Sequence, residues 1–268
     1  MACLIAESAR VHPRARVHED AVIGPCCVIG PQVQIGRGTR LLSQVCLTGV
    51  IKIGEFNTLG PFVSIGDVPQ DVSCDDPDTE VQIGDNNTIH ERVTIHRGSE
   101  KEDGITRIGS NNQLFAGAHI AHDCKLCDRI SIGVGSMLGG HVHVESHVAV
   151  MEKVGIHQFV TVGGDSFVGA HSKITQDVPR YMRVEGNPPI VRGINGRSLK
   201  QRGLLGAALA ALREAHRMIY VVKMPLEQAA TLLDDHGHLT SEVLLLVKFL
   251  ESQHEGRMGR SRWRRNGI

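Results

Sequence analysis

The feature that most constrains the fold is a six-residue repeat of aliphatic side chains in the middle of the chain. From Ile108 to Ile174 every sixth residue is Ile, Leu or Val, which makes twelve consecutive positions. Helical faces recur about every 3.6 residues and strand faces every 2 residues. A strict period of six fits neither, and it is typical of a parallel β-helix, in which three short strands make one coil of about eighteen residues.

The same phase starts near the beginning of the chain, at Ile5, and continues to Ile65. Two segments interrupt it, and we predict loops near residues 67–82 and 97–107. After residue 190 the aliphatic spacing becomes helical. The sequence therefore predicts a β-helix over residues 1–190, an α-helical domain over 191–256, and a basic tail over 257–268 that we expect to be frayed.

Composition supports a repeat protein and excludes several classes of function. Only 3% of the residues are aromatic and 30 are glycines, which suits a thin stack of aliphatic side chains better than an ordinary globular core. Lys+Arg and Asp+Glu are both 29, so no bulk attraction to nucleic acid is indicated. Seven scattered cysteines fit a reducing cytosol. No signal peptide or membrane span is apparent, so we predict a cytoplasmic protein.

Histidines within the repeat carry the candidate chemistry. His122 and His141 are nineteen residues apart, which places them on adjacent coils near one corner, and His157 follows about one coil later. With His119 they would line one groove spanning about 10 Å. A neutral imidazole can act as general base near pH 7, and Asp123 follows His122 directly and could orient it. No Ser or Cys nucleophile is indicated, which favours direct transfer without a covalent enzyme intermediate.

Metal binding is the main alternative for these histidines, together with a plain role in turns. Cys124 and Cys127 form a single C-x-x-C without a second pair. We expect no cysteine or carboxylate to converge with the histidines at ligand spacing, and therefore predict neither a metal site nor a cofactor.

Several ordered motifs resemble the acyl-carrier-protein–UDP-N-acetylglucosamine O-acyltransferases of lipid A biosynthesis. The main ones are H-I-A-H-D-C at 119–124, G-H-V at 140–142, H-Q-F at 157–159, Q-D-V-P at 176–179 and G-N at 186–187. The resemblance extends from about Ile5 to about Tyr220. It implies a mainly β fold with a left-handed parallel β-helix, a homotrimer with active sites between subunits, and acyl carrier protein and a UDP-amino sugar as substrates.

The resemblance also implies residue roles. His122 would be the general base that takes a proton from the sugar 3-hydroxyl, Asp123 would orient it, and the Gly140 N–H would stabilise the oxyanion. Ala170 would end the acyl groove and set the chain length. The substrate-binding residues would be Gln70, Asp71, His119, His141, His157, Gln158, Asn195 and Arg202, with Gln70 and Asp71 reaching in from a neighbouring subunit.

Four departures from the family pattern concern the recognition of the nucleotide more than the base. Ser73 stands where the family often has Lys, Arg197 replaces a carboxylate, Gln201 replaces the first of two arginines, and Met151-Glu152 replaces a Gly-Gly pair. Three interpretations therefore stay open. The chain is an O-acyltransferase for UDP-N-acetylglucosamine, an acyltransferase for a different UDP-amino sugar, or a non-catalytic paralogue that serves as a binding subunit.

Overall fold

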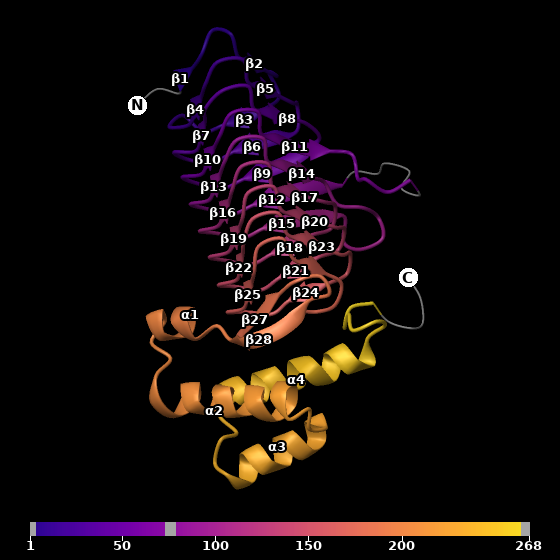
Figure 1. Ribbon diagram of the computed structural model, residues 1–268. Helices are drawn as coiled ribbons and strands as arrows, with labels where there is room; N and C mark the ends of the chain where they lie inside the picture. The colour runs from indigo at the N-terminus through magenta and orange to yellow at the C-terminus, as the bar shows by residue number, and fades with distance from the viewer. Residues whose placement is uncertain (1–3, 73–78, 264–268) are drawn as a thin grey trace.

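Stacked parallel strands form the body of the molecule, and helices lie below the last coil (Figure 1). The computed structural model describes residues 4–72 and 79–263. From β1 to β26, strands three places apart along the chain pair in parallel, and β25 then pairs in parallel with β27, which produces a three-sided parallel β-helix. This confirms the prediction of a mainly β, parallel repeat.

Three sheets make the three sides, and their strands within the described residues are as follows. The eleven-stranded sheet contains β1 (Leu4–Ile5), β4 (Val22–Ile23), β7 (Arg40–Leu41), β10 (Thr58–Leu59), β13 (Thr88–Ile89), β16 (Gln113–Leu114), β19 (Ser131–Ile132), β22 (Ala149–Val150), β25 (Phe167–Val168), β27 (Met182–Glu185) and β28 (Ile190–Ile194). The nine-stranded sheet contains β2 (Arg10–Val11), β5 (Val28–Ile29), β8 (Cys46–Leu47), β11 (Ser64–Asp67), β14 (Thr94–His96), β17 (His119–Ile120), β20 (Met137–Leu138), β23 (Gly155–Ile156) and β26 (Lys173–Ile174). The eight-stranded sheet contains β3 (Arg16–Val17), β6 (Val33–Ile35), β9 (Val50–Ile53), β12 (Glu80–Ile83), β15 (Ile105–Ile108), β18 (Lys125–Leu126), β21 (His143–Val144) and β24 (Thr161–Val162).

The aliphatic repeat fills the interior of the stack. Ile120 pairs with Leu138 on the next coil, and Leu126 pairs with Val144, so the repeated side chains lie directly above one another. These positions are almost fully buried. The register shows that a separation of eighteen residues corresponds to one coil here. The prediction that His122 and His141 lie on adjacent coils rests on this relation.

Two segments leave the wall of the stack on the side of β11 and β14 (Figure 1). The first follows β11, and part of it lies outside the described residues, including Ser73. The second connects β14 to β15 through residues 97–104. Strands β12 and β15 begin at Glu80 and Ile105, inside the ranges where we predicted loops.

Helices follow the last strand, β28. They are α1 (Gly196–Gln201), α2 (Gly206–His216), the π-helix η1 (Arg217–Val221), α3 (Leu226–Asp235) and α4 (Ser241–Glu255). Leu212, Leu233 and Leu246 belong to their common core, which also takes in Met182 from β27. The division of the chain at residues 190 and 256 stays a prediction. Of the helices that the structure describes, none combines the length and apolar character of a membrane span.

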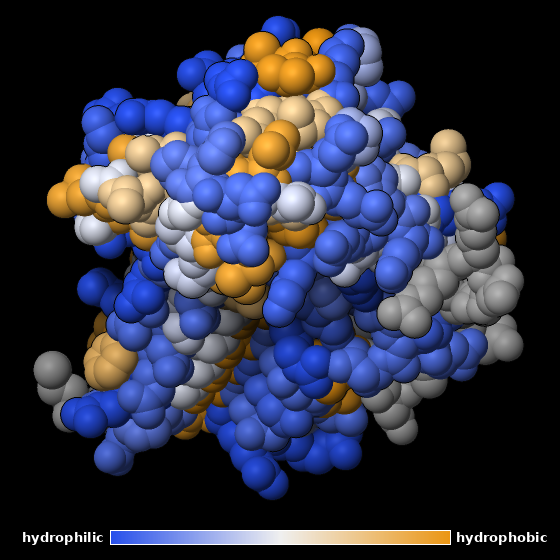
Figure 2. Space-filling view, turned by 90° about the horizontal axis from the view of Figure 1, so that it is seen from below, coloured by the Kyte–Doolittle hydropathy of each residue, from blue (hydrophilic) through white to orange (hydrophobic). Residues whose placement is uncertain are grey.

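The helical end presents a mainly hydrophilic surface with separate apolar patches (Figure 2). After α4 the chain turns back beside the coils instead of continuing outward (Figure 1). The expectation of a frayed basic tail is wrong for residues 257–263. Arg260 is buried, and Arg257 and Arg260 form a β-bridge with each other.

Candidate active site

One corner of the β-helix repeats on three successive coils and places the candidate residues. After β17, β20 and β23 the chain turns through Asp123, His141 and Phe159, whose φ angles are 60°, 62° and 63°. A side chain in this left-handed region is uncommon, and Asp and His tolerate it better than most residues. The corner therefore stacks His122 and Asp123 directly above His141, as the spacing predicted.

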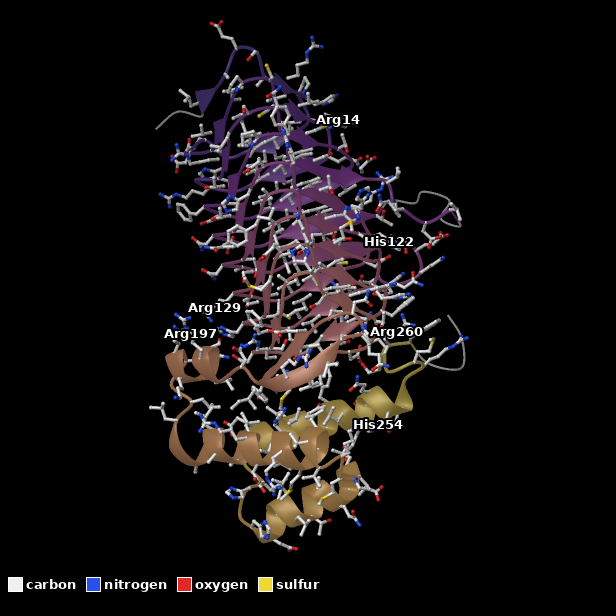
Figure 3. All side chains as sticks on the ribbon, in the orientation of Figure 1. Arg14, His122, Arg129, Arg197, His254 and Arg260 are labelled. Carbon is white, nitrogen blue, oxygen red and sulfur yellow. The ribbon has the colours of Figure 1, made fainter. Side chains whose placement is uncertain are left out.

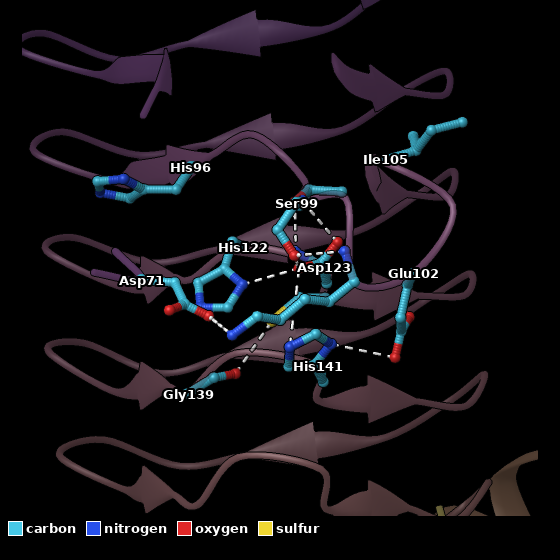
Figure 4. A network of polar contacts seen from close by, with 12 residues as sticks. Asp71, His96, Ser99, Glu102, Ile105, His122, Asp123, Gly139 and His141 are labelled. Carbon is cyan, nitrogen blue, oxygen red and sulfur yellow. Dashed lines mark hydrogen bonds and ion pairs between the residues drawn. The ribbon is translucent and has the colours of Figure 1, made fainter. Parts of the chain in front are cut away.

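His122 and Asp123 form a buried hydrogen-bonded pair at this corner (Figure 4). His122 Nδ1 lies 2.8 Å from Asp123 Oδ2. The same carboxylate accepts hydrogen bonds from Ser99, at 2.8 Å from the backbone N–H and 2.6 Å from the hydroxyl. Burial opposes ionisation of Asp123, but the hydrogen bonds from His122 and Ser99 outweigh it and lower the pKa of the carboxyl. An ionised Asp123 holds the ring proton on Nδ1, so Nε2 is the atom left to accept another proton.

Gly140 lies against the imidazole of His122. A Cβ atom built on Gly140 would be 2.6 Å from both Cε1 and Nε2 of His122, closer than real Cβ contacts allow. Among the described residues, its N–H donates no hydrogen bond. The site therefore needs glycine here. The Gly140 N–H is an unused backbone donor beside His122, as an oxyanion site requires.

Two other histidines of the corner have different surroundings. His141 Nδ1 lies 3.1 Å from Glu102 Oε1 and its Nε2 lies 3.8 Å from Asp123 Oδ2. His119 Nδ1 is 2.8 Å from the hydroxyl of Thr94. Burial is the main reason that the pKa of His119 is lowered, and His96 and His122 lower it further. His119 is therefore a neutral hydrogen-bonding group at neutral pH.

A groove of about 430 Å³ opens on the outer face of the nine-stranded sheet beside these residues. The register aligns Met137, Gly155 and Lys173 in one row across it, and a Cβ on Gly155 would meet no atom within 4 Å. The missing side chain leaves the groove open in the middle. The predicted site residues that line it are Gln70, His119, His122, Gly140, His157 and Gln158.

Besides Asp123 and His141 of the corner, four predicted site residues do not line this groove. Asp71 forms an ion pair of 2.5 Å with Lys101, near His122 (Figure 4). Asn195 donates to the Asp165 carbonyl at 2.9 Å, and Arg202 pairs with the Asp165 carboxylate.

Ala170 is the fourth of these residues, and it lies half-buried in the turn between β25 and β26. Arg197, which stands where the family has a carboxylate, lies on the opposite side of the molecule from His122 (Figure 3). A single chain therefore brings His122 and its neighbours together, but it does not place the residues predicted for the nucleotide end in the same groove.

The expectation that no carboxylate would converge with the histidines at ligand spacing is wrong, because Asp123 lies close to both His122 and His141. Ligand atoms of His122, Asp123 and His141 all lie within 4.8 Å of one another. The 2.8 Å separation of His122 Nδ1 and Asp123 Oδ2 is a direct hydrogen bond. Two ligands of one tetrahedral zinc ion would be roughly 3.4 Å apart. The geometry favours a hydrogen-bonded pair over a metal centre.

The surroundings of Cys124 also disfavour a thiol nucleophile at this site. Cys124 is fully buried next to Asp123, and burial raises the pKa of its thiol to about 12. Its Sγ donates to the Gly139 carbonyl at 3.2 Å. This cysteine stays protonated and packed in the wall, which agrees with transfer without a covalent enzyme intermediate.

Sequence reasoning missed several residues that complete the corner. Ser99 and Glu102 come from the segment between β14 and β15, where the repeat gave no signal. Arg262 contacts Glu102 at 2.6 Å and also donates to the His141 carbonyl. Trp263 stacks on Phe159, with ring centroids 6.2 Å apart. The five arginines and single tryptophan near the C-terminus were the one available hint of this contact.

Known proteins similar to this chain are UDP-N-acetylglucosamine acyltransferases. The family model for "Udp N-acetylglucosamine O-acyltransferase; Domain 2" matches residues 177–258. LpxA from Acinetobacter baumannii is 37% identical, with 91% of this chain and 95% of that chain covered and a TM-score of 0.87. The UDP-N-acetylglucosamine acyltransferase of Francisella novicida is 34% identical over 92% and 91% of the two chains, with a TM-score of 0.87. The Arabidopsis UDP-N-acetylglucosamine acyltransferase is 32% identical over 93% and 96%, with a TM-score of 0.80.

Proposed function

Because the chain belongs to the UDP-N-acetylglucosamine O-acyltransferase family, we propose that it transfers a 3-hydroxyacyl group from acyl carrier protein to the 3-hydroxyl of UDP-N-acetylglucosamine. This is the first step of lipid A biosynthesis. The observation that carries the proposal is the buried His122–Asp123 pair, with the unused N–H of Gly140 beside its free ring nitrogen. This is a base and an oxyanion donor at adjacent positions, which is what acyl transfer to a hydroxyl requires.

In the proposed reaction, His122 Nε2 takes the proton of the sugar 3-hydroxyl as the oxygen attacks the carbonyl carbon of the thioester. The carbonyl oxygen becomes an oxyanion and accepts a hydrogen bond from the Gly140 N–H. The tetrahedral intermediate collapses with cleavage of the carbon–sulfur bond. The thiolate of the carrier leaves and takes the proton back from the His122 imidazolium, whose charge the Asp123 carboxylate stabilises in the meantime.

The other predicted site residues take substrate-binding roles in this proposal. His119, His141, His157 and Gln158 hold the sugar nucleotide in the groove. Gln70 lines the groove of its own chain, and its role in a neighbouring subunit, together with Asp71, remains a prediction.

Asn195 and Arg202 reach the nucleotide only if another copy of the chain supplies them, because they lie outside the groove of their own chain. We therefore infer that the sites lie between subunits, and the resemblance to the family leads us to propose a homotrimer with left-handed coils.

A different UDP-amino sugar remains the second candidate acceptor. Arg197, Gln201 and Met151-Glu152 change the charge and bulk expected near the nucleotide, while the pair formed by His122 and Asp123 is intact. This combination favours retained acyl transfer with altered acceptor choice over a non-catalytic paralogue.

The test is acylation of a panel of UDP-amino sugars by the purified protein with 3-hydroxyacyl carrier proteins. His122→Ala should lower kcat by roughly 10²–10⁴-fold while its circular dichroism spectrum stays that of the wild type. The matched control is His12→Ala, which alters an exposed histidine at the far end of the stack. A His122→Ala enzyme within tenfold of wild type would refute the assignment of the base, and no acylation of any UDP-amino sugar would refute the function.

A further inference from the structure

The C-terminal segment, residues 257–263, packs against Phe159 and brings a buried arginine to His157 and Gln158, which line the groove. The guanidinium groups of Arg257 and Arg260 lie 4.6 Å and 4.1 Å from the ring centroid of Trp263. The Trp263 ring also stacks on Phe159, with 10° between the ring planes. Arg260 lies on the same side of the molecule as His122 (Figure 3). The segment therefore presents its positive charge at the candidate active site.

Arg260 is a buried cation that forms no ion pair with a carboxylate of the described residues; burial lowers its pKa, and the charge of Asp177 opposes this only in part. It is 3% exposed, and its Nε has no hydrogen-bond partner. The nearby carboxylate of Asp177 instead accepts backbone N–H groups, from Thr161 and Ser261, both at 2.7 Å. The neighbouring Arg262, by contrast, pairs with Glu102. Buried charges are normally paired because desolvation is costly, so a bound anion would supply the close ion pair that Arg260 lacks.

The donors around Arg260 converge on the end of the groove. Its Nη1 contacts His157 Nδ1 and also lies 3.3 Å from the Gln158 carbonyl. His157 Nδ1 also lies 3.2 Å from the Gln158 carbonyl. A guanidinium only donates, so when Arg260 is the partner of Nδ1 the ring proton lies on Nε2, which can then donate to a ligand. Lys173 lines the groove together with His157. Arginine, an imidazole N–H and lysine together are the donor set that suits a phosphate group.

We propose that Arg260, His157 and Lys173 form a phosphate subsite at the end of the groove. The inference rests on the proposed function, because both substrates of that reaction carry phosphate. His157 lies about two coils, or roughly 10 Å, from His122. The phosphate is either the diphosphate of the sugar nucleotide, which begins two ring carbons from the reacting hydroxyl, or the phosphodiester of the prosthetic arm of the carrier protein.

Trp263, the single tryptophan of the chain, is a built-in probe of this subsite. Titration of the full-length protein with UDP, inorganic pyrophosphate or 4′-phosphopantetheine should change its fluorescence, because a bound phosphate draws Arg260 away from the indole ring. Arg260→Gln should abolish the change, and Arg260→Lys should restore part of it because it keeps the charge but not the planar fork. Arg257→Gln is the matched control, since it removes an equal charge beside the same ring from an exposed position.

Steady-state kinetics identify the source of the phosphate. Arg260→Gln should raise the KM of one substrate by about 10- to 100-fold, either the UDP-sugar or the acyl carrier protein, while Arg257→Gln stays within about twofold of wild type. If Arg260→Gln keeps both KM values and the fluorescence response, the subsite is wrong and the proposed acyl transfer stands. If Arg260→Gln abolishes the fluorescence change but the wild-type protein acylates no UDP-amino sugar, the subsite stands and the proposed function is wrong.

Discussion

Replacing Gly140 by alanine tests the geometry of the base and the oxyanion donor together. The new methyl carbon would lie 2.6 Å from Cε1 and Nε2 of His122, about 1 Å inside an ordinary van der Waals contact. The imidazole is braced through Nδ1 by Asp123, and Asp123 is in turn held by Ser99. The ring therefore must give up its hydrogen bond, or the Gly140 N–H must move away from the reacting carbonyl.

Either displacement should lower the catalytic rate. A misplacement of about 1 Å costs roughly 10²-fold in rate, and loss of one oxyanion donor costs about 10²–10³-fold in kcat. We expect Gly140→Ala to lower kcat by about 10²–10³-fold with little change in the KM of the UDP-sugar. Gly193→Ala is the control, because a Cβ there would meet no atom within 4 Å and the residue lies in β28, away from the groove. The assay is initial-rate acylation with both substrates varied.

Two outcomes of that experiment would contradict this reasoning. If Gly140→Ala retains more than a tenth of the wild-type kcat, the imidazole tolerates displacement or is not the base. If kcat falls equally in Gly193→Ala, the loss reflects the substitution of glycine in general and not the contact with His122. Thermal unfolding of both variants separates either outcome from simple destabilisation.

Three further predictions concern the carboxylate, the assembly and the acyl chain. Hydrogen bonds lower the pKa of Asp123, so its stabilising charge is present above the usual carboxyl range and is lost as the pH falls through its own lower value. Urea unfolding should therefore show Ser99→Ala destabilised by about 1–3 kcal/mol at pH 7, with the gap to wild type narrowing below about pH 4; a gap independent of pH would refute the link. Mixed and reassembled His122→Ala and Arg202→Ala proteins should regain part of the activity lost by each, whereas no recovery would argue against sites shared between subunits. With donors of increasing length, Ala170→Gly should shift the optimum longer and Ala170→Met shorter, because one methylene at a packed groove end costs roughly 1–3 kcal/mol; unchanged profiles would place the groove end elsewhere.

The repeat made the corner predictable from the sequence. The six-residue period fixes which residues turn inward, and the register then places His122 and His141 on adjacent coils. Asp123 is adjacent in sequence to the base it contacts. Contacts between sequence neighbours, and contacts between residues one coil apart, can both be predicted from a single sequence.

The groups that complete the corner could not be predicted in the same way. Ser99 lies in a segment that leaves the repeat, so no period relates it to Asp123, twenty-four residues away. Arg260 contacts His157 across a separation of 103 residues. Such contacts depend on the path of an irregular segment and on how the helices dock below the last coil, and neither follows from aliphatic spacing or charge.

A regular repeat supplies equivalent corners, and the irregular segments make one of them chemically distinct. His141, His147 and His171 all occupy corners with φ angles between 57° and 64°. His171 is exposed, and burial lowers the pKa of His147. Both share the left-handed backbone conformation of His141, but neither belongs to the cluster formed by His122, Asp123 and His141. His141 differs because the segment after β14 brings Glu102 to its Nδ1, and burial of that carboxylate is outweighed by His141 and Arg262, which lower its pKa. We therefore expect acyl transfer to depend on the segment between β14 and β15, which contacts Asp123 and His141, and changes in it should alter activity without altering the stack of coils.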